Sequence, residues 1–364
     1  MRFSYTFSFY VIRNLLLNLL YVLLTFMFIA FIIDFLELIR EAQGTRVLIN
    51  QMLQMSFYKT PFLVFSFFPF IFLFGSILTF TKLNNSYELI AAKCAGISIW
   101  SISIPIALVV VILSSIILWV FQPISAILLD NNRILGTKYF GYQAKRVSLQ
   151  SNGVWIFDQN KKPEDDKIIF IQHVKTGKTL EKVSIYSAGT ENNYTTSYSA
   201  SSVTIENMKL ILNDVTKKAP GIEPKHYKHL SLKTGLSENQ IQQDIPHPDI
   251  IPFWKLNRFI NKIKQSGFSA LRHELYYQSM LATPLLYLSL VLIALSCSIN
   301  LPRKGKLGIV FVTGGMIGIF IFFIDKIANV MALTGVLPVT LAAITPGCIY
   351  LLLSIAILIH FEES

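Results

Sequence analysis

Two short motifs have residue types suited to nucleotide or metal chemistry, and neither has the spacing that this chemistry needs. KTGKT (175–179) ends like a phosphate-binding loop, but the glycine that opens such a loop would stand where the chain has Gln172. HYKH (226–229) offers two histidines without a further cluster of ligands, and a zinc site takes at least three protein ligands. The sequence therefore predicts no catalytic residue, no metal site and no cofactor in this chain.

The charged residue with the most informative setting is Glu88, in the polar segment NNSYELIAAKCAGIS (84–98) between two long apolar runs. Asn85 can cap a helix, the Glu88 side chain can reach back to that cap, and Gly96 can end the helix in the left-handed conformation. The pattern predicts a helix over residues 86–95, and about ten helical residues span about 15 Å.

One face of this predicted helix carries a single carboxylate among small side chains, Glu88, Ala91, Ala92 and Ala95. Small side chains let another surface approach closely, and Glu88 offers its charge to a basic partner. A short helix held between two membrane segments could act as a lever through which an ATPase moves them. The alternative is an ordinary capped loop helix, and the residue types alone leave both interpretations open.

The composition predicts a membrane protein. Hydrophobic residues make up 53% of the 364-residue chain and charged residues only 15%, with a mean hydropathy of +0.53, whereas soluble domains carry about 25% charged residues. A membrane-spanning helix needs about 20 mainly apolar residues. Six such runs occur, at about residues 12–36, 58–80, 98–122, 276–299, 307–331 and 337–359.

Between the third and fourth apolar runs the chain is polar and contains short apolar stretches separated by turns such as KTGKT and TENN. Such stretches are typical of β-strands, and their succession without a helical run predicts an all-β sandwich or barrel. The predicted strands contain VWIFDQ, KIIFIQHV, KVSIYSA, SYSASSVTI and MKLILNDV.

The distribution of Lys and Arg over the short loops predicts the orientation, because cytoplasmic loops carry an excess of both. The sequence therefore predicts that both termini are cytoplasmic and that the β-domain is outside. One side would carry Arg2, Arg13, Lys82, Lys93, Arg303, Lys304 and Lys306, and the other Arg40, Arg46 and Lys59.

The predicted division assigns residues 1–123 to three membrane helices with the cytoplasmic helix, 124–252 to the β-domain, 253–274 to a connector and 275–364 to three further membrane helices. The connector begins with FWKLNRFINKIKQSGF (253–268), whose apolar side chains recur at helical spacing while Lys and Arg occupy the other face. This amphipathic helix could lie on the outer membrane–water interface or pack on the β-domain, and both interpretations stay open.

The segment SYELIAAKCAGIS (86–98) resembles the motif S-E-L-(x)4-A-(S/C)-G-(hydrophobic) of the lipopolysaccharide export permeases, the LptF/LptG (YjgP/YjgQ) family. The resemblance extends over the whole chain, through YVIRNLLLNLL (10–20), GVWIF (153–157) and LPRKGKLG (301–308). The stretch FIDKIANVMALTGVLPVTLAAITP (323–346) looks more like LptG than LptF.

This resemblance implies six transmembrane helices with an inserted periplasmic, jellyroll-like β-domain, in the inner membrane of a Gram-negative cell. It implies a pair with the second permease LptF, a dimer of the ATPase LptB that binds ATP and Mg, the single-helix subunit LptC, and LptA. The pair would extract lipopolysaccharide from the outer leaflet, and this chain would hydrolyse nothing.

The net charge of +11 does not imply a nucleic-acid partner, since the β-domain lies outside the cytoplasm. The ATPase would dock on Ser86, Tyr87, Glu88, Leu89, Ala91, Ala92, Ala95 and Gly96.

Lipopolysaccharide carries anionic phosphates and wide acyl chains, so its site requires a cationic rim above an apolar cavity. Arg40 and Arg133, at the outer ends of the first and third membrane helices, are the candidates for the rim. Asp34 and Asp130 stand where the resemblance implies basic residues, so either the lipid headgroup differs or the partner subunit supplies the charge. Each arginine could instead be a snorkelling, solvated side chain.

Further candidates lie within the membrane helices. Phe26 and Phe31 of the Phe-rich first helix could line the acyl cavity, or face lipid or the core. Gly314 and Gly318 form a small-xxx-small pair that predicts close helix packing, against the partner's first helix at a lateral gate or within this subunit. Asp325 is expected to make a polar contact inside the bundle.

Two other classes of function compete with transport. A membrane-anchored assembly scaffold would have neither an ATPase partner nor a central lipid. An intramembrane enzyme would need a polar catalytic pair deep in the membrane, and the one candidate pair, Asp325 and Lys326, lies near a membrane edge.

Overall fold

The computed structural model divides into two compact units, a helical unit (Met1–Gly141, Pro252–Trp254 and Glu274–Ser364) and a unit that contains a β-sheet (Tyr142–Ile251 and Lys255–His273). The structure describes residues 5–43, 47–140, 147–150, 153–158, 167–175, 179–188, 194–206, 209–219, 222–234, 246–265, 268–300 and 307–363.

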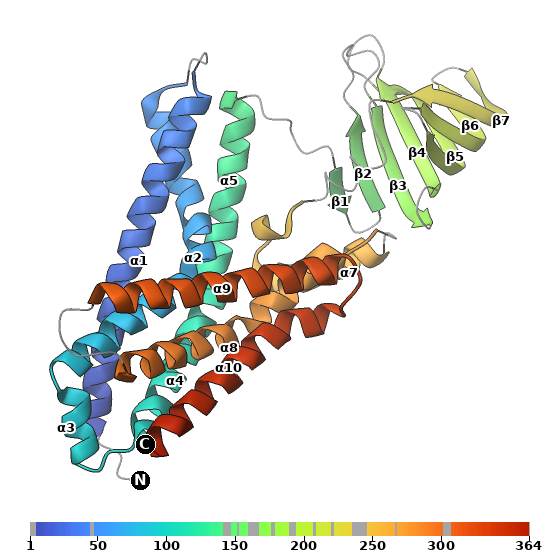
Figure 1. The fold of residues 1–364 in the computed structure, drawn as a ribbon. Coiled ribbons are helices and arrows are strands. Elements are labelled where there is room, and N and C mark those ends of the chain that lie inside the picture. Colours follow the sequence, from blue (N-terminus) through green and yellow to red (C-terminus); the bar gives the residue numbers. More distant parts are fainter. Residues whose placement is uncertain are drawn as a thin grey trace. The chain divides into compact units, whose positions relative to one another are not determined.

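In the described residues of the helical unit, six helical runs are long and apolar enough to cross a membrane, as the sequence predicts. They are α1 (Tyr5–Glu41), α2 (Ile49–Asn85), the run of α4 (Ile99–Ile116), π-helical η1 (Ile117–Phe121) and α5 (Gln122–Phe140), then α8 (Leu271–Asn300), α9 (Leu307–Leu333) and α10 (Val339–Glu363). The short α3 (Glu88–Cys94) follows α2. The start of α1, α3 and the end of α10 lie at one end of this unit, and the end of α1 lies at the other (Figure 1).

The third membrane helix extends well beyond its apolar run. Helix continues through α5 to Phe140, so the predicted start of the β-domain at residue 124 falls within a helix, and the first described strand begins at Val147. Polar residues after position 122 lower the hydropathy, but the helix still packs along its length. Leu129 is buried, and Asn132 Nδ2 donates a hydrogen bond of 2.6 Å to the carbonyl oxygen of Met55 in α2.

The core of the helical unit is built mainly from α1, α2, α4 and α8. A methyl group at Gly75 would lie 2.7 Å from Cδ2 of Leu19, so this glycine lets α1 and α2 approach each other closely. The fully buried Tyr287 of α8 stacks on Phe72 of α2, with ring centroids 4.5 Å apart. The same α2 therefore contacts helices from both halves of the sequence.

The second unit contains an antiparallel sheet, whose strands the short apolar stretches between turns predict, and the described strands follow one another in chain order. Every pairing joins neighbours in the chain, which is the arrangement of a meander, and the jellyroll-like form stays a prediction. The strands are β1 (Val147–Gln150), β2 (Gly153–Asp158), β3 (Lys167–Lys175), β4 (Thr179–Ala188), β5 (Tyr194–Glu206), β6 (Lys209–Ala219) and β7 (Ile222–Lys233). One face of the sheet supplies its core, since alternate residues such as Ile169 and Ile171 are buried.

The two ends of the KTGKT motif lie on paired strands. Residues 176–178 lie outside the described part of the chain, but Lys175 and Thr179 pair with each other across antiparallel β3 and β4. A phosphate-binding loop would need a helix after the strand.

A 3₁₀ turn, η3 (Pro248–Ile250), precedes the connector, which forms the helix α7 (Phe253–Gln265). Leu256, Ile260 and Ile263 of α7 are buried and Lys255 is exposed, as expected if the apolar face of α7 packs on protein.

Candidate functional site

The chain passes from α2 into α3 through Ser86 and Tyr87. Tyr87 has the left-handed φ of 61°, and Gly96 has φ of 76° after the end of α3, as the glycine predicts. Asn85 is the last residue of α2, and Ser86 N still donates to the carbonyl oxygen of Lys82. The prediction that Asn85 caps the following helix is therefore wrong, because the backbone of α2 continues further than the polar composition suggests.

One residue of the face predicted to be open to a partner, Ala92, is buried. Leu89 and Ala92 are 8% and 6% exposed, and they lie three residues apart on one side of the helix. Leu89 belongs to the core of the helical unit, so Ala92 also faces the protein interior. Ala91, Ala95 and Tyr87 are exposed and form the small surface that a partner could reach.

The carboxylate of Glu88 is held by two hydroxyl groups. Ser86 Oγ donates a hydrogen bond of 2.9 Å to Glu88 Oε1, and Tyr10 Oη of α1 donates one of 3.3 Å to the same oxygen. Glu88 is therefore connected both to the turn before α3 and to the first membrane helix.

An apolar groove with a volume of about 330 Å³ lies between α1, α2 and the third membrane helix. The π-helical η1 contributes to its wall, and π-helical turns occur frequently at functional sites. The groove is lined by Leu16, Leu19, Leu20, Leu23, Phe68, Ile71, Phe72, Leu113, Ile116, Ile117, Val120, Phe121 and Ile124.

The predicted phenylalanines do not line this groove. Phe26 packs against Phe67, with ring centroids 5.5 Å apart, and Phe31 stacks on Phe35 at 6.2 Å. The wall from α1 consists of leucines spaced at i, i+3, i+4 and i+7 from position 16. This spacing places the four leucines on one face of α1. The sequence pattern could therefore have identified the groove wall, but the many phenylalanines of the same helix were chosen instead.

An ion pair joins α1 and α2. Lys59 Nζ lies 2.5 Å from Asp34 Oδ1 and 3.5 Å from Glu37 Oε2. Ser56 Oγ donates a hydrogen bond of 2.7 Å to Asp34 Oδ2. The Asp34 side chain is fully buried and that of Lys59 is 30% exposed. Lys59 is predicted from the sequence as a loop charge, but it lies within α2. Sequence reasoning therefore missed the pair, although two opposite charges within neighbouring membrane helices favour one.

The two candidate arginines lie on helices that pack together at the same end of the unit. Arg40 is exposed in the last turn of α1, and Arg133 is half-buried in α5. Leu38 of α1, Met52 of α2 and Leu135 of α5 belong to one apolar cluster at this end. This packing brings the helices of the predicted rim together.

Gly314 and Gly318 face α2 of the same chain. A methyl group at Gly314 would collide with Cδ1 of Ile77, and one at Gly318 would lie 2.8 Å from Cδ2 of Leu73. Packing within this subunit, the alternative to a gate contact with a partner, therefore accounts for both glycines.

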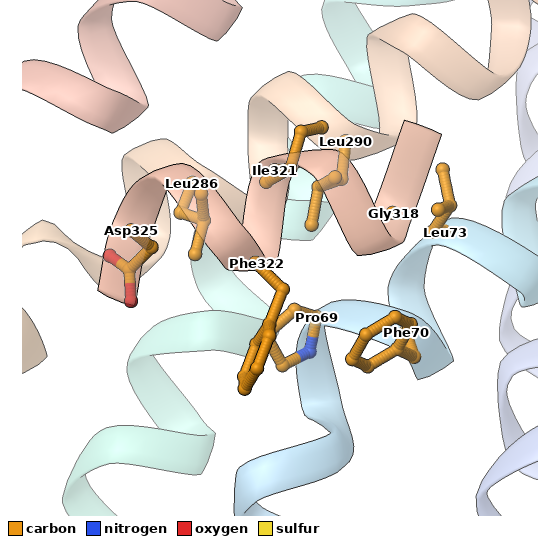
Figure 2. Close-up of a pocket in the computed structure, with 9 residues that line it drawn as sticks. All are labelled: Pro69, Phe70, Leu73, Leu286, Leu290, Gly318, Ile321, Phe322 and Asp325. Carbon is orange, nitrogen blue, oxygen red and sulfur yellow. The ribbon is translucent and has the colours of Figure 1, made fainter. Parts of the chain in front are cut away.

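Figure 2 shows a small pocket lined by Gly318, Leu73 and other residues of α2, α8 and α9, with Asp325 at its edge. Its volume is about 30 Å³, about the space of one water molecule, so it cannot hold an acyl chain. Asn329 Nδ2, one turn further along α9, donates a hydrogen bond of 3.1 Å to Asp325 Oδ2. A contact of Asp325 with another helix of the bundle stays a prediction.

In the described part of the chain, no group of three or more His, Cys, Asp or Glu side chains is placed to hold a metal ion. His226 instead lies 2.8 Å from Asp214, and His229 lies 2.8 Å from Asn213.

Comparison with known proteins agrees with the membrane fold. The family model "Lipopolysaccharide export system permease LptF/LptG" matches residues 9–360. Two curated relatives, the lipopolysaccharide export system permease proteins LptG of Escherichia coli K12 and of E. coli O6:H1, are each 25% identical over 308 residues, covering 81% of this chain and 81% of the relative. The chain is a multi-pass membrane protein that belongs to the LptF/LptG family of lipopolysaccharide export system permeases.

Proposed function

We propose that this chain is the LptG-like permease subunit of an ABC-type transporter that extracts lipopolysaccharide from the outer leaflet of the inner membrane. The observation that carries the proposal is the apolar groove walled by α1, α2 and the third membrane helix. Its lining is aliphatic and aromatic, which suits acyl chains. The second permease subunit, LptF, would supply the other half of the cavity.

The outer end of the groove helices would meet the lipid headgroup. Arg40 and Arg133 supply the cationic rim in this proposal, and Phe26 and Phe31 extend the apolar wall of α1 toward it. Asp34 adds no free negative charge there, because it is buried and paired with Lys59. A charge that is neutralised within the protein repels a phosphate far less than an exposed carboxylate does.

The energy would come from a separate ATPase dimer, LptB, which binds ATP and Mg and docks on α3. Closure of the dimer would move α3 and, through it, the helices of the groove. The lipid leaves only if the groove loses affinity for it in one of its two states. In the proposal it passes to the periplasmic β-domain, LptC and LptA on its way to the outer membrane.

The direct test is to tag the chain in its native membrane, purify it in a mild detergent and identify the proteins and lipids that accompany it. Recovery of a second six-helix permease, a soluble ATPase and lipopolysaccharide is the expected result. Recovery of the chain without an ATPase in several detergents would favour the scaffold function.

A variant with a larger side chain in the groove tests whether the groove binds the acyl chains of the lipid. Leu20→Trp places a larger side chain in the groove, so less lipopolysaccharide should co-purify with the complex. Leu17→Trp is the matched control, because Leu17 is exposed on the same helix and is not among the groove-lining residues. Equal amounts of lipid with both variants would argue against the groove as the acyl site.

A further inference from the structure

The hydrogen bonds of Glu88 leave one of its carboxylate oxygens available. Ser86 and Tyr10 both donate to Oε1, and in the described part of the chain no donor is placed at Oε2. A carboxylate fixed through one oxygen has lost much of its rotational freedom before a partner arrives. Its second oxygen can accept a charge-assisted hydrogen bond from a Lys or Arg of that partner.

Tyr10 belongs to the helix that walls the groove. Leu16, the first groove residue of α1, follows Tyr10 by six positions, or about 9 Å of helix. From Tyr5 to Glu41 α1 contains neither proline nor glycine, so a displacement at Tyr10 is passed along a regular helix to the groove. The covalent paths from α3 run instead through α2, where Pro69 lies between Phe68 and Ile71 of the groove, and through α4, where Pro105 precedes Leu113. Proline is a common cause of helix kinks.

We propose that Tyr10 is a positioning residue that joins the docking helix to the groove-lining helix through the Glu88 carboxylate. This inference rests on the proposed function. Movement of a basic ATPase residue bound to Glu88 would then act on α1 directly, and not only on α2 and α4, which the chain joins to α3.

The test uses the complete complex of this chain with its second permease and its ATPase, reconstituted in proteoliposomes with lipopolysaccharide. Tyr10→Phe removes the hydroxyl donor and keeps the ring. The lipid released per ATP hydrolysed should fall by about fivefold, the lower end of the range for coupled sites, while ATPase binding is retained. Tyr21→Phe is the matched control, since Tyr21 is exposed three turns along the same helix and should leave the ratio unchanged.

A double-variant comparison separates a role through Glu88 from a merely structural role of Tyr10. Glu88→Asp keeps the charge but shortens the side chain by one C–C bond of about 1.5 Å, which takes the carboxylate beyond reach of Tyr10. Adding Tyr10→Phe to Glu88→Asp should therefore cause no further loss of lipid released per ATP.

The outcomes distinguish this inference from the function on which it rests. If the wild-type complex contains no ATPase, both are overturned. If the ATPase is present and stimulated but Tyr10→Phe behaves like Tyr21→Phe, or its effect adds fully to that of Glu88→Asp, only the role of Tyr10 is overturned.

Discussion

At the scale of single residues, the notable feature is a buried carboxylate of a membrane helix, Asp34, that is paired within the chain. Asp34 is fully buried, and it accepts a hydrogen bond from Ser56 and an ion pair from Lys59. Burial of a charge is costly unless a partner and further hydrogen bonds compensate for it. The pair therefore fixes the rotation of α1 relative to α2 near the proposed headgroup site.

Removing one partner of this pair should destabilise the protein measurably. We expect Asp34→Asn to cost about 2 kcal/mol, below the about 3–5 kcal/mol of a fully buried pair, because the Lys59 side chain is 30% exposed. The matched control is Glu37→Gln, at a carboxylate that is 59% exposed and 3.5 Å from the same amine, with an expected cost of about 0.5 kcal/mol or less. The apparent melting temperature in one detergent measures both, and equal shifts would contradict a structural role specific to Asp34.

At the scale of elements, contacts between α2 and its neighbours organise the helical unit. At Gly75, α2 packs closely against α1. Its side chains Ile77 and Leu73 contact α9 at Gly314 and Gly318. Glycines permit such close approach in membrane bundles, where van der Waals packing contributes much of the association energy. The groove helices and α9 are thus connected through one central helix.

The α2–α9 contact predicts that alanine substitutions at two glycines of α9 differ in their effect on stability. Gly318→Ala should destabilise the protein by about 1–3 kcal/mol through overpacking, because the new methyl group would lie 2.8 Å from Leu73. Gly315→Ala should be nearly neutral, since its nearest neighbour, a ring atom of Phe74, is 3.7 Å away. Thermal unfolding of the two variants in the same detergent checks this, and a larger effect of Gly315→Ala would disprove the assigned packing.

At the scale of the whole molecule, the arrangement of helix ends is consistent with the proposed orientation. The start of α1, α3 and the end of α10 lie at one end of the helical unit (Figure 1), and an ATPase could dock there only if that end is cytoplasmic. The sheet unit follows α5, whose last turn packs with the opposite ends of α1 and α2. The proposed periplasmic location of the β-domain follows from this connectivity and the six membrane crossings.

Labelling with a membrane-impermeant maleimide tests this orientation. Cys94 of α3 is exposed and should react in inverted inner-membrane vesicles but not in spheroplasts. Ser199→Cys, at an exposed position of β5 in a Cys94→Ser background, should react in spheroplasts but not in inverted vesicles. The opposite pattern would reverse the topology and place α3 out of reach of a cytoplasmic ATPase.

The sequence alone determined the features that depend on neighbouring residues. Apolar runs of sufficient length predicted the six membrane helices, short apolar stretches between turns predicted the strands, and Gly96 predicted the left-handed end of α3. These predictions succeed because hydropathy, turn residues and glycine conformation act over a few adjacent positions. The family motif around Glu88 is also local, so it could be found without a fold.

Only the tertiary structure decided which residues face one another. The pairing of Asp34 with Lys59, the burial of Ala92, the contacts of Gly314 and Gly318 with α2, and the hydrogen bond from Tyr10 to Glu88 join positions on different helices or depend on how a helix is rotated. A sequence periodicity defines the faces of a helix, but it does not determine which neighbour each face meets. That choice is made by the packing of all the helices together, because each close contact must fit its neighbours at the same time.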